Sequence, residues 1–210
     1  MSKILISGYY GFANAGDEAM LTAIIESLRQ VEKNVELTVL SGNPEDTAAK
    51  HQVCSVYRFN PLGIIRAMKD SELIISGGGS LLQDVTSKRS LLYYLSIIGL
   101  GKFFGKKVML FAQGIGPIRA KWARKLTSLV CNEADLITVR DSESAVELIE
   151  MGVKPEKITV TADSVLSLNP VTKECGQYLL QEAGVDLTKP VIGISVRPWS
   201  GDSQCFQVLA

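Results

Sequence analysis

The stretch "KILISGYYGFANAGDEAML", residues 3–21, joins a short apolar run to the beginning of an amphipathic run. The first five residues predict a buried strand, and the residues from Asp17 onward predict a helix. The connection between them is longer than the roughly two to six residues that are usual in an α/β unit. It contains Gly8, Gly11 and Gly16, so we expect this loop to do more than turn the chain.

Short β-branched runs alternate with stretches of helical period along most of the chain. The strands are apolar on both faces, which is typical of a parallel sheet covered by helices on both sides. With right-handed crossovers, this pattern predicts an α/β fold, a Rossmann-like doubly wound parallel sheet. The predicted strands are 3–7, 35–41, 73–77, 107–113, 136–140 and 157–161, and the predicted helices are 17–32, 60–70, 89–104, 119–134 and 142–151.

Unusual loops follow five of these predicted strands directly. In parallel sheets of this kind, ligands bind at the carboxyl ends of the strands. We therefore expect the five loops to form the rim of an active site at one edge of the sheet. They read "GYYGFANAGDE", "SGGGSLLQD", "AQGIGP", "VRDSES" and "TADSVLSL".

The pattern changes after residue 170, where a polar stretch precedes a short helical run and a new apolar strand, "PVIGISVRPW". A strand of this type needs neighbours to satisfy its backbone and bury its faces. We expect residues 1–170 to form one Rossmann-like domain. Residues 171–210 are then a linker and the first strand of an incomplete second domain; the alternative is that this strand extends the first sheet. Arg197, at its end, suits bidentate recognition of phosphate or carboxylate.

Composition narrows the classes of function. The chain has no net charge, so it lacks the basic surface that nucleic-acid binding needs. Its four cysteines lie far apart, which fits a reduced, cytoplasmic protein without a disulfide framework. The first predicted strand leaves no room for a signal peptide. The apolar segment "SLLYYLSIIGLGKFFG" falls short of a bilayer span and predicts a buried helix, with contact to a membrane surface or a lipid-linked substrate as the alternative.

The first loop offers candidate sugar-binding groups. Gly8 and Gly11 permit positive φ and a close backbone approach to a ligand, and Asn14 tolerates a left-handed conformation. Tyr9 and Tyr10 offer an apolar face and a phenol for hydrogen bonding.

Asp17 and Glu18 fall in the first turn of the helix that follows. The helix dipole alone would favour acidic side chains there. The alternative is that these carboxylates hold or deprotonate sugar hydroxyl groups, which makes Asp17 and Glu18 the candidate catalytic residues.

Other loops add further candidates. Gly77, Gly78 and Gly79 either line a concavity for an oxygen-rich ligand or allow close packing of strand against helix. Gln113 ends a strand and is expected to reach into the crevice. Arg140 either binds a ligand or forms an orienting ion pair with Asp141. Asp163 is one more carboxylate at a strand end.

Several common sites are absent from the sequence. The glycines of the first loop do not fit the dinucleotide or P-loop patterns. The only histidine, His51, lies in a polar stretch away from these loops and is expected to be a surface residue. A hydrolase triad is therefore not expected, nor is a metal site or a cofactor.

The five loops, in this order, resemble the polysaccharide pyruvyl transferase family over essentially the first 170 residues. Within the family the chain is most similar to enzymes that pyruvylate the bacterial secondary cell-wall polysaccharide, the ligand of S-layer proteins. The resemblance implies a two-domain GT-B fold with the active site between the domains. It also implies the residues that match family motifs: Asn14, Asp17 and Glu18; Gly77, Gly78 and Gly79; Arg140 and Asp141; and Arg197 for the donor.

The reaction implied is transfer of pyruvate from phosphoenolpyruvate to a sugar. In the cell-wall branch, a ketal forms across the 4- and 6-hydroxyls of a β-linked N-acetylmannosamine on a lipid-diphosphate-linked precursor. By analogy with GT-B enzymes, the N-terminal domain holds this acceptor at the inner face of the cell membrane. The family's donor-binding histidine has no counterpart here. We therefore expect an acceptor half with little or no activity alone.

Two other functions fit the same fold. One is a conventional GT-B glycosyltransferase that takes a nucleotide sugar as donor. The other is a non-catalytic glycan-binding module.

Overall fold

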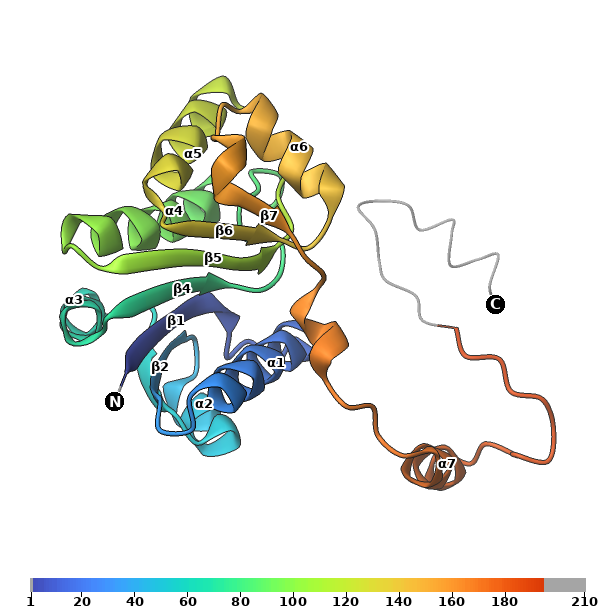
Figure 1. Cartoon of the computed structure of the whole chain (residues 1–210). Coiled ribbons are helices and arrows are strands. Elements are labelled where there is room, and N and C mark those ends of the chain that lie inside the picture. Colours follow the sequence, from blue (N-terminus) through green and yellow to red (C-terminus); the bar gives the residue numbers. More distant parts are fainter. Residues whose placement is uncertain (1, 195–210) are drawn as a thin grey trace. The chain divides into compact units, whose positions relative to one another are not determined.

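The computed structural model describes residues 2–194 of the chain (Figure 1). The chain divides into two units, Met1–Leu168 and Asn169–Ala210. The first unit contains the sheet and all of the strand-end loops that the sequence singles out.

Seven parallel strands form the sheet of the first unit, in the order β3-β2-β1-β4-β5-β6-β7. The order changes direction between β1 and β4, and ligands bind beside such a switch point in open α/β sheets. The strands are β1 (Lys3–Tyr10), β2 (Glu36–Ser41), β3 (Cys54–Tyr57), β4 (Leu73–Gly77), β5 (Lys107–Gln113), β6 (Leu136–Val139) and β7 (Ile158–Val160).

Helices cover both faces of this sheet (Figure 1). Helices α1 (Ala15–Val31) and α2 (Pro44–His51) lie on one face. Helices α3 (Pro61–Asp70), α4 (Lys88–Phe103), α5 (Lys121–Glu133) and α6 (Ser142–Glu150) lie on the other, as right-handed crossovers require. Two 3₁₀ turns, η1 (Pro155–Lys157) and η2 (Ser164–Ser167), flank β7.

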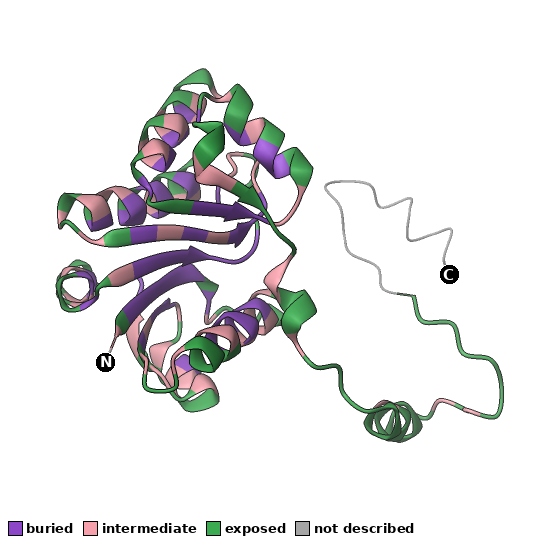
Figure 2. Ribbon diagram, viewed as in Figure 1, coloured by how far each residue is buried: buried purple, intermediate pink, exposed green. Residues whose placement is uncertain are grey.

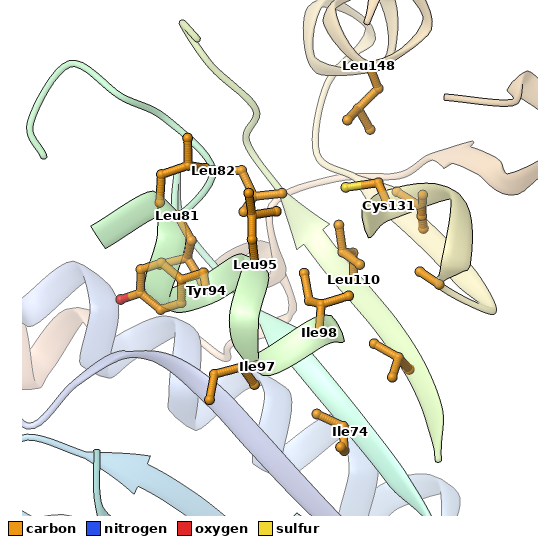
Figure 3. Packing of buried hydrophobic residues seen from close by; sticks show 14 of the residues in the cluster. Ile74, Leu81, Leu82, Tyr94, Leu95, Ile97, Ile98, Leu110, Cys131 and Leu148 are labelled. Carbon is orange, nitrogen blue, oxygen red and sulfur yellow. The ribbon is translucent and has the colours of Figure 1, made fainter. Parts of the chain in front are cut away.

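The hydrophobic core has two layers, one on each side of the strands (Figure 2). Leu21 and Ile24 of α1 pack against Ile6 and Val39 in the smaller layer. The larger layer gathers side chains from α3 to α6 and includes Leu95, Ile98, Leu110, Cys131 and Leu148 (Figure 3). Each such side chain stabilises the fold by about 1.5–3 kcal/mol relative to exposure, so the sheet gives the loops a rigid base.

The predicted Rossmann-like fold is confirmed. All six predicted strands and all five predicted helices occur in the first unit, with ends that shift by a few residues. The sequence prediction missed α2 and β3. Strand β3 has only four residues, none of them fully buried, because it is the edge strand of the sheet. Helix α2 buries only Thr47, so it lacks an apolar stripe.

The apolar segment around residues 89–104 forms α4, a helix packed into the larger core layer as predicted. Leu91, Tyr94, Leu95 and Ile98 are buried there. Among the helices that the structure describes, none combines the length and apolar character needed to cross a bilayer.

The second unit contains helix α7 (Lys173–Glu182), which buries none of its side chains. The strand predicted at 190–199 is not formed in its described part, since residues 190–194 have no regular structure. A strand needs a neighbour for its backbone groups, and no described strand pairs with these residues. The remainder of that segment, including Arg197, lies outside the described residues.

Candidate active site

The first loop leads into α1 through a side-chain cap. Asn14 Oδ1 accepts hydrogen bonds from the backbone N–H groups of Gly16, at 3.0 Å, and Asp17, at 3.4 Å. Its φ of −89° is extended, so Asn14 does not use the left-handed conformation that it could tolerate. Ala13, with a φ of 56°, takes that conformation instead. Asn14 is N-cap because its short amide satisfies two of the helix's free N–H groups.

Glu18 connects the first loop to α2. Its Oε1 accepts a 2.8 Å hydrogen bond from the backbone N–H of Gly11, and its Oε2 lies 3.4 Å from His51 Nε2. The side chain of His51 is only 9% exposed. The prediction that His51 is a surface residue away from the loops is therefore wrong, because α2, which was not predicted, places it against α1.

The loop at the end of β4, residues 77–80, is called the glycine loop below. Asp17 lies where the first loop meets the glycine loop. A Cβ atom added at Gly79 would be 3.3 Å from Asp17 Oδ1. Since Gly79 follows β4 and Asp17 follows β1, the two central strands of the switch point bring these residues together.

Tyr10 is a core residue and not a ligand contact. Its side chain is 1% exposed, and its hydroxyl donates a 2.8 Å hydrogen bond to the carbonyl oxygen of Gly77. Burial raises the pKa of this phenol. A Cβ at Gly8 would lie 2.3 Å from the Tyr10 ring, so Gly8 makes room for the ring. The predictions that Tyr10 and Gly8 approach the acceptor are therefore wrong: Tyr10 points to the α1 face, and its ring fills the open side of Gly8.

The glycine loop packs closely on α1. Cβ atoms at Gly77 and Gly78 would lie 2.9 Å from Ile24 and 3.2 Å from Met20. Gly78 and Gly79 have φ of 67° and 74°, which side chains rarely tolerate. At Gly77 and Gly78 the structure favours the packing interpretation, and Gly79 alone faces a candidate catalytic side chain.

Gln113 contacts β4, the strand that leads into the glycine loop. It is fully buried, and its Nε2 donates to the carbonyl oxygen of Ser76 at 2.9 Å and to Ser76 Oγ at 2.8 Å. The expectation that Gln113 reaches into the crevice is wrong, because its amide is held inside the sheet by Ser76 on the neighbouring strand.

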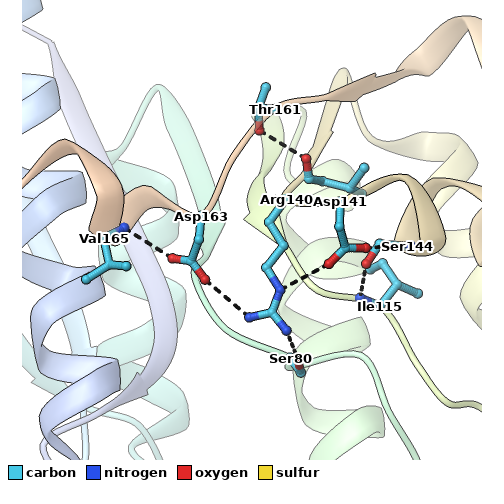
Figure 4. Close-up of polar contacts among 9 residues, drawn as sticks. Ser80, Ile115, Arg140, Asp141, Ser144, Thr161, Asp163 and Val165 are labelled. Carbon is cyan, nitrogen blue, oxygen red and sulfur yellow. Dashed lines mark hydrogen bonds and ion pairs between the residues drawn. The ribbon is translucent and has the colours of Figure 1, made fainter. Parts of the chain in front are cut away.

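Arg140 is the centre of a network at the ends of β6 and β7 (Figure 4). Its Nε donates to Asp141 Oδ2 at 3.3 Å, Nη1 to Asp163 Oδ2 at 3.2 Å and Nη2 to Ser80 Oγ at 3.2 Å. The side chain packs on Gly114, where a Cβ would lie 2.7 Å from Nε. Because all three guanidinium nitrogens have protein partners, Arg140 orients three loops.

Both carboxylates of this network also cap helical turns. Asp141 Oδ1 accepts a 2.7 Å bond from the N–H of Ser144 at the start of α6. Hydrogen bonds from Ser144 lower the pKa of Asp141. Asp163 Oδ1 accepts from the N–H of Val165 in η2 at 3.1 Å. The Arg140–Asp163 contact therefore fixes the loop after β7 relative to the glycine loop.

Sequence reasoning missed Arg58 and the cluster of aromatic rings around it, of which only Tyr9 was a candidate site residue that the structure leaves exposed. Arg58 follows β3 directly and is 4% exposed. Recognition of β3 would have placed Arg58 at a strand end, the same signal that singled out Arg140. The rings around it belong to Tyr9, Phe12, Phe59, Tyr93 and Tyr94, with centroids 4.4–5.9 Å from its Cζ.

Tyr9 and Phe12 present the accessible aromatic surface of the rim. Their rings stack with centroids 4.4 Å apart and are 40% and 41% exposed. Stacked rings of this kind offer an apolar face to a sugar.

A separate cavity of about 440 Å³ between β3 and α3 contains none of the predicted site residues.

Solved structures share the fold. HepE from Anabaena, in complex with UDP and glucose, has a TM-score of 0.56 at 12% identity, over 88% of this chain and 50% of its own. A glycosyltransferase from Rickettsia africae has a TM-score of 0.55 at 12% identity, over 90% and 51%. The UDP-GlcNAc 2-epimerase of Neisseria meningitidis, bound to UDP-GlcNAc, has a TM-score of 0.52 at 12% identity, over 86% and 50%. The chain thus spans about half the length of these proteins.

No curated protein sequence matches the chain. The model of the family described as polysaccharide pyruvyl transferase matches residues 14–196. This match includes Asn14, Asp17, the glycine loop and the Arg140 network. Since it covers most of the chain, the protein belongs to the polysaccharide pyruvyl transferase family.

Proposed function

We propose that this chain binds the sugar acceptor of a ketal-forming pyruvyl transfer from phosphoenolpyruvate. The observation that carries the proposal is the position of Asp17, at the carboxyl edge of the sheet and beside Gly79, in a chain of this family. The neighbouring rings of Tyr9 and Phe12 are accessible to a sugar.

The proposed reaction balances as follows. A general acid protonates the methylene carbon of phosphoenolpyruvate, and cationic character develops at C2. One sugar hydroxyl adds to C2 and gives its proton to Asp17. Phosphate then leaves with the electrons of its C–O bond, and the second hydroxyl closes the ring and gives its proton to the conjugate base of the general acid. The products are a ketal and inorganic phosphate. A positioned base contributes roughly 10²–10⁴ in rate, and orientation of both hydroxyls contributes more.

Glu18, the other carboxylate in the first turn of α1, has a positioning role in this proposal. Both oxygens of Glu18 already contact protein groups, Gly11 and His51. Glu18 therefore keeps the first loop in place. Arg140 and Asp163 hold the opposite side of the rim.

For the acceptor we propose the 4- and 6-hydroxyls of an N-acetylmannosamine on a lipid-diphosphate-linked cell-wall precursor, at the inner face of the membrane. The resemblance to the S-layer branch of the family supports this choice. The same resemblance supports Arg197 as a ligand of phosphoenolpyruvate, with the remaining donor contacts supplied by a second domain.

The test is phosphate release from phosphoenolpyruvate in the presence of a lipid-linked disaccharide. It is run on this chain and on the chain joined to a complete C-terminal domain. Release by the joined protein is expected. In that protein, Asp17→Asn is expected to lower kcat by about 10²–10⁴. Glu26→Gln, an exposed acidic position on the same helix, is the matched control and keeps kcat within twofold. Normal turnover by Asp17→Asn excludes Asp17 as the base.

A nucleotide-sugar glycosyltransferase is the second candidate, because the glycosyltransferase from Rickettsia africae shares the fold and HepE, which also shares it, was solved with UDP and glucose. Transfer from UDP-glucose by the joined protein, without phosphate release from phosphoenolpyruvate, would favour it. Glycan binding without either turnover would favour a non-catalytic binding module.

A further inference from the structure

Arg58 is a buried cation surrounded by aromatic rings. Its guanidinium is covered by five aromatic rings, and its Nη2 donates a long, 3.4 Å hydrogen bond to the Tyr94 hydroxyl. Nε and Nη1 are buried and have no hydrogen-bond partner in the described part of the chain. None of the ion pairs formed among residues 2–194 includes Arg58.

Such an arrangement is costly in an isolated protein. Cation–π contacts stabilise a guanidinium by about 0.5–2 kcal/mol each, so the five rings offset part of the several kcal/mol that burial of an unpaired charge costs, but they give its N–H groups no oxygen acceptor. Buried donors without acceptors cost free energy as well. The fold therefore retains Arg58 at a cost that an anionic oxygen ligand would offset.

Two more hydroxyls near this position lack partners. Ser7 Oγ, within β1, and the Tyr93 hydroxyl are both buried and without a hydrogen-bond partner among the described residues. The Tyr93 ring is the nearest to the guanidinium, at 4.4 Å. These hydroxyls can donate or accept, and together with Nε and Nη1 of Arg58 they form a buried polar group with unused hydrogen-bonding capacity. A phosphate group, with several acceptor oxygens, matches that capacity.

The surface above this group suits a sugar. Tyr9 and Phe12 stack over the guanidinium at 5.9 and 5.3 Å, and Phe59 contacts it at 5.2 Å. These three rings are 40%, 41% and 61% exposed. Gly11, with a φ of 77°, lies between Tyr9 and Phe12 and gives their loop a conformation that side chains rarely adopt. The ring pair therefore lies over Arg58, where the sugar of a bound diphosphate would meet it.

We propose that Arg58, Ser7 and Tyr93 bind the diphosphate of a diphosphate-linked sugar, and that Tyr9, Phe12 and Phe59 pack on its sugar ring. This subsite lies on the same strand-end edge as Asp17, so it anchors the acceptor while its hydroxyls approach the base. The inference rests on the proposed acceptor function, but its test measures binding and needs no turnover.

The experiment is calorimetric titration of the full chain with a decyl-diphosphate-linked N-acetylglucosamine, inorganic pyrophosphate, UDP and phosphoenolpyruvate. The decyl-linked sugar and pyrophosphate are expected to bind. Arg58→Gln is expected to weaken both about tenfold or more, as for loss of a hydrogen-bonded charge. Phe12→Ala is expected to weaken the sugar ligand and leave pyrophosphate unchanged. Arg66→Gln, which removes an exposed arginine from α3, is the matched control and leaves both affinities unchanged.

Thermal melting of the ligand-free protein separates a binding role from a structural one. Removal of an unpaired buried charge by Arg58→Met is expected to raise Tm by about 2–4 °C, while Arg58→Lys keeps the charge but lacks the guanidinium fork. Equal affinities for pyrophosphate in the wild type, in Arg58→Gln and in Arg58→Met overturn the proposal. Arg58-dependent binding of phosphoenolpyruvate or UDP, with no binding of the decyl-linked sugar, overturns the assignment to the acceptor. Arg58-dependent binding of both pyrophosphate and the decyl-linked sugar upholds the proposal even if pyruvyl transfer is never observed.

Discussion

The hydroxyl of Tyr10 donates a 2.8 Å hydrogen bond to the carbonyl oxygen of Gly77 and so connects the first loop with the glycine loop inside the core. The two residues end the strands on either side of the switch point, β1 and β4. The relative position of Asp17 and Gly79 therefore depends on a contact that is buried in the core.

Tyr10→Phe removes this bond and keeps the ring. The free energy of unfolding is expected to fall by about 0.5–1.5 kcal/mol, the net contribution of a typical hydrogen bond. Urea denaturation measures the change. Tyr178→Phe, at an exposed position on α7, is the control and is expected to leave stability unchanged. Equal stability of Tyr10→Phe and the wild type would show that the bond adds nothing to the fold.

Gly79→Ala tests the close approach of the glycine loop to α1. The new methyl group would lie 3.3 Å from Asp17 Oδ1 and would hold alanine at a φ of 74°. We expect a loss of about 1–2 kcal/mol in stability and a displaced Asp17 carboxylate. Gly99→Ala is the opposite control, since nothing lies within 4 Å of its added Cβ in α4. It is expected to raise stability by about 0.5–1 kcal/mol. Urea denaturation of both variants decides the sign of each change.

Gly114→Ala and Arg140→Ala are expected to act through the same network. The methyl group at residue 114 would lie 2.7 Å from Arg140 Nε and would push the guanidinium away from Asp163. Because either change breaks the same contacts, their effects on stability should not add. A double-mutant cycle by urea denaturation measures this coupling. A double variant whose loss equals the sum of the two single losses would mean that Gly114 and Arg140 are independent.

The sequence predicts the fold well because alternating buried strands and amphipathic helices leave a clear pattern. It misses β3 and α2, whose residues are too exposed to carry that pattern. Those two elements place His51 beside Glu18 and Arg58 among its rings. The largest errors about the site therefore come from one missed αβ unit, α2 and β3.

Side-chain direction is the second limit of sequence reasoning. Successive residues of a strand point to opposite faces, so Tyr9 joins the exposed rings while Tyr10 enters the core. Composition treats the two tyrosines alike. Gln113 is a similar case, since its polar amide at a strand end points to Ser76 and away from the crevice.

The lowered pKa of Asp135 allows a prediction of how the free energy of unfolding changes with pH. Partial desolvation raises the pKa of this carboxyl. Hydrogen bonds from Lys102, the N–H of Val108 and Lys107 together lower it by more, so that the pKa falls to about 2. The folded pKa is thus below the unfolded value of about 3.9. The charged carboxylate therefore stabilises the fold fully above about pH 5, and this contribution is lost as the pH falls toward 2. Asp135→Asn is expected to cost about 1–2 kcal/mol at pH 7, discounted for the exposure of Lys107. The difference from the wild type should shrink steadily below pH 4 in urea denaturation. A difference that stays constant from pH 7 to pH 2.5 would exclude titration of Asp135 as its cause.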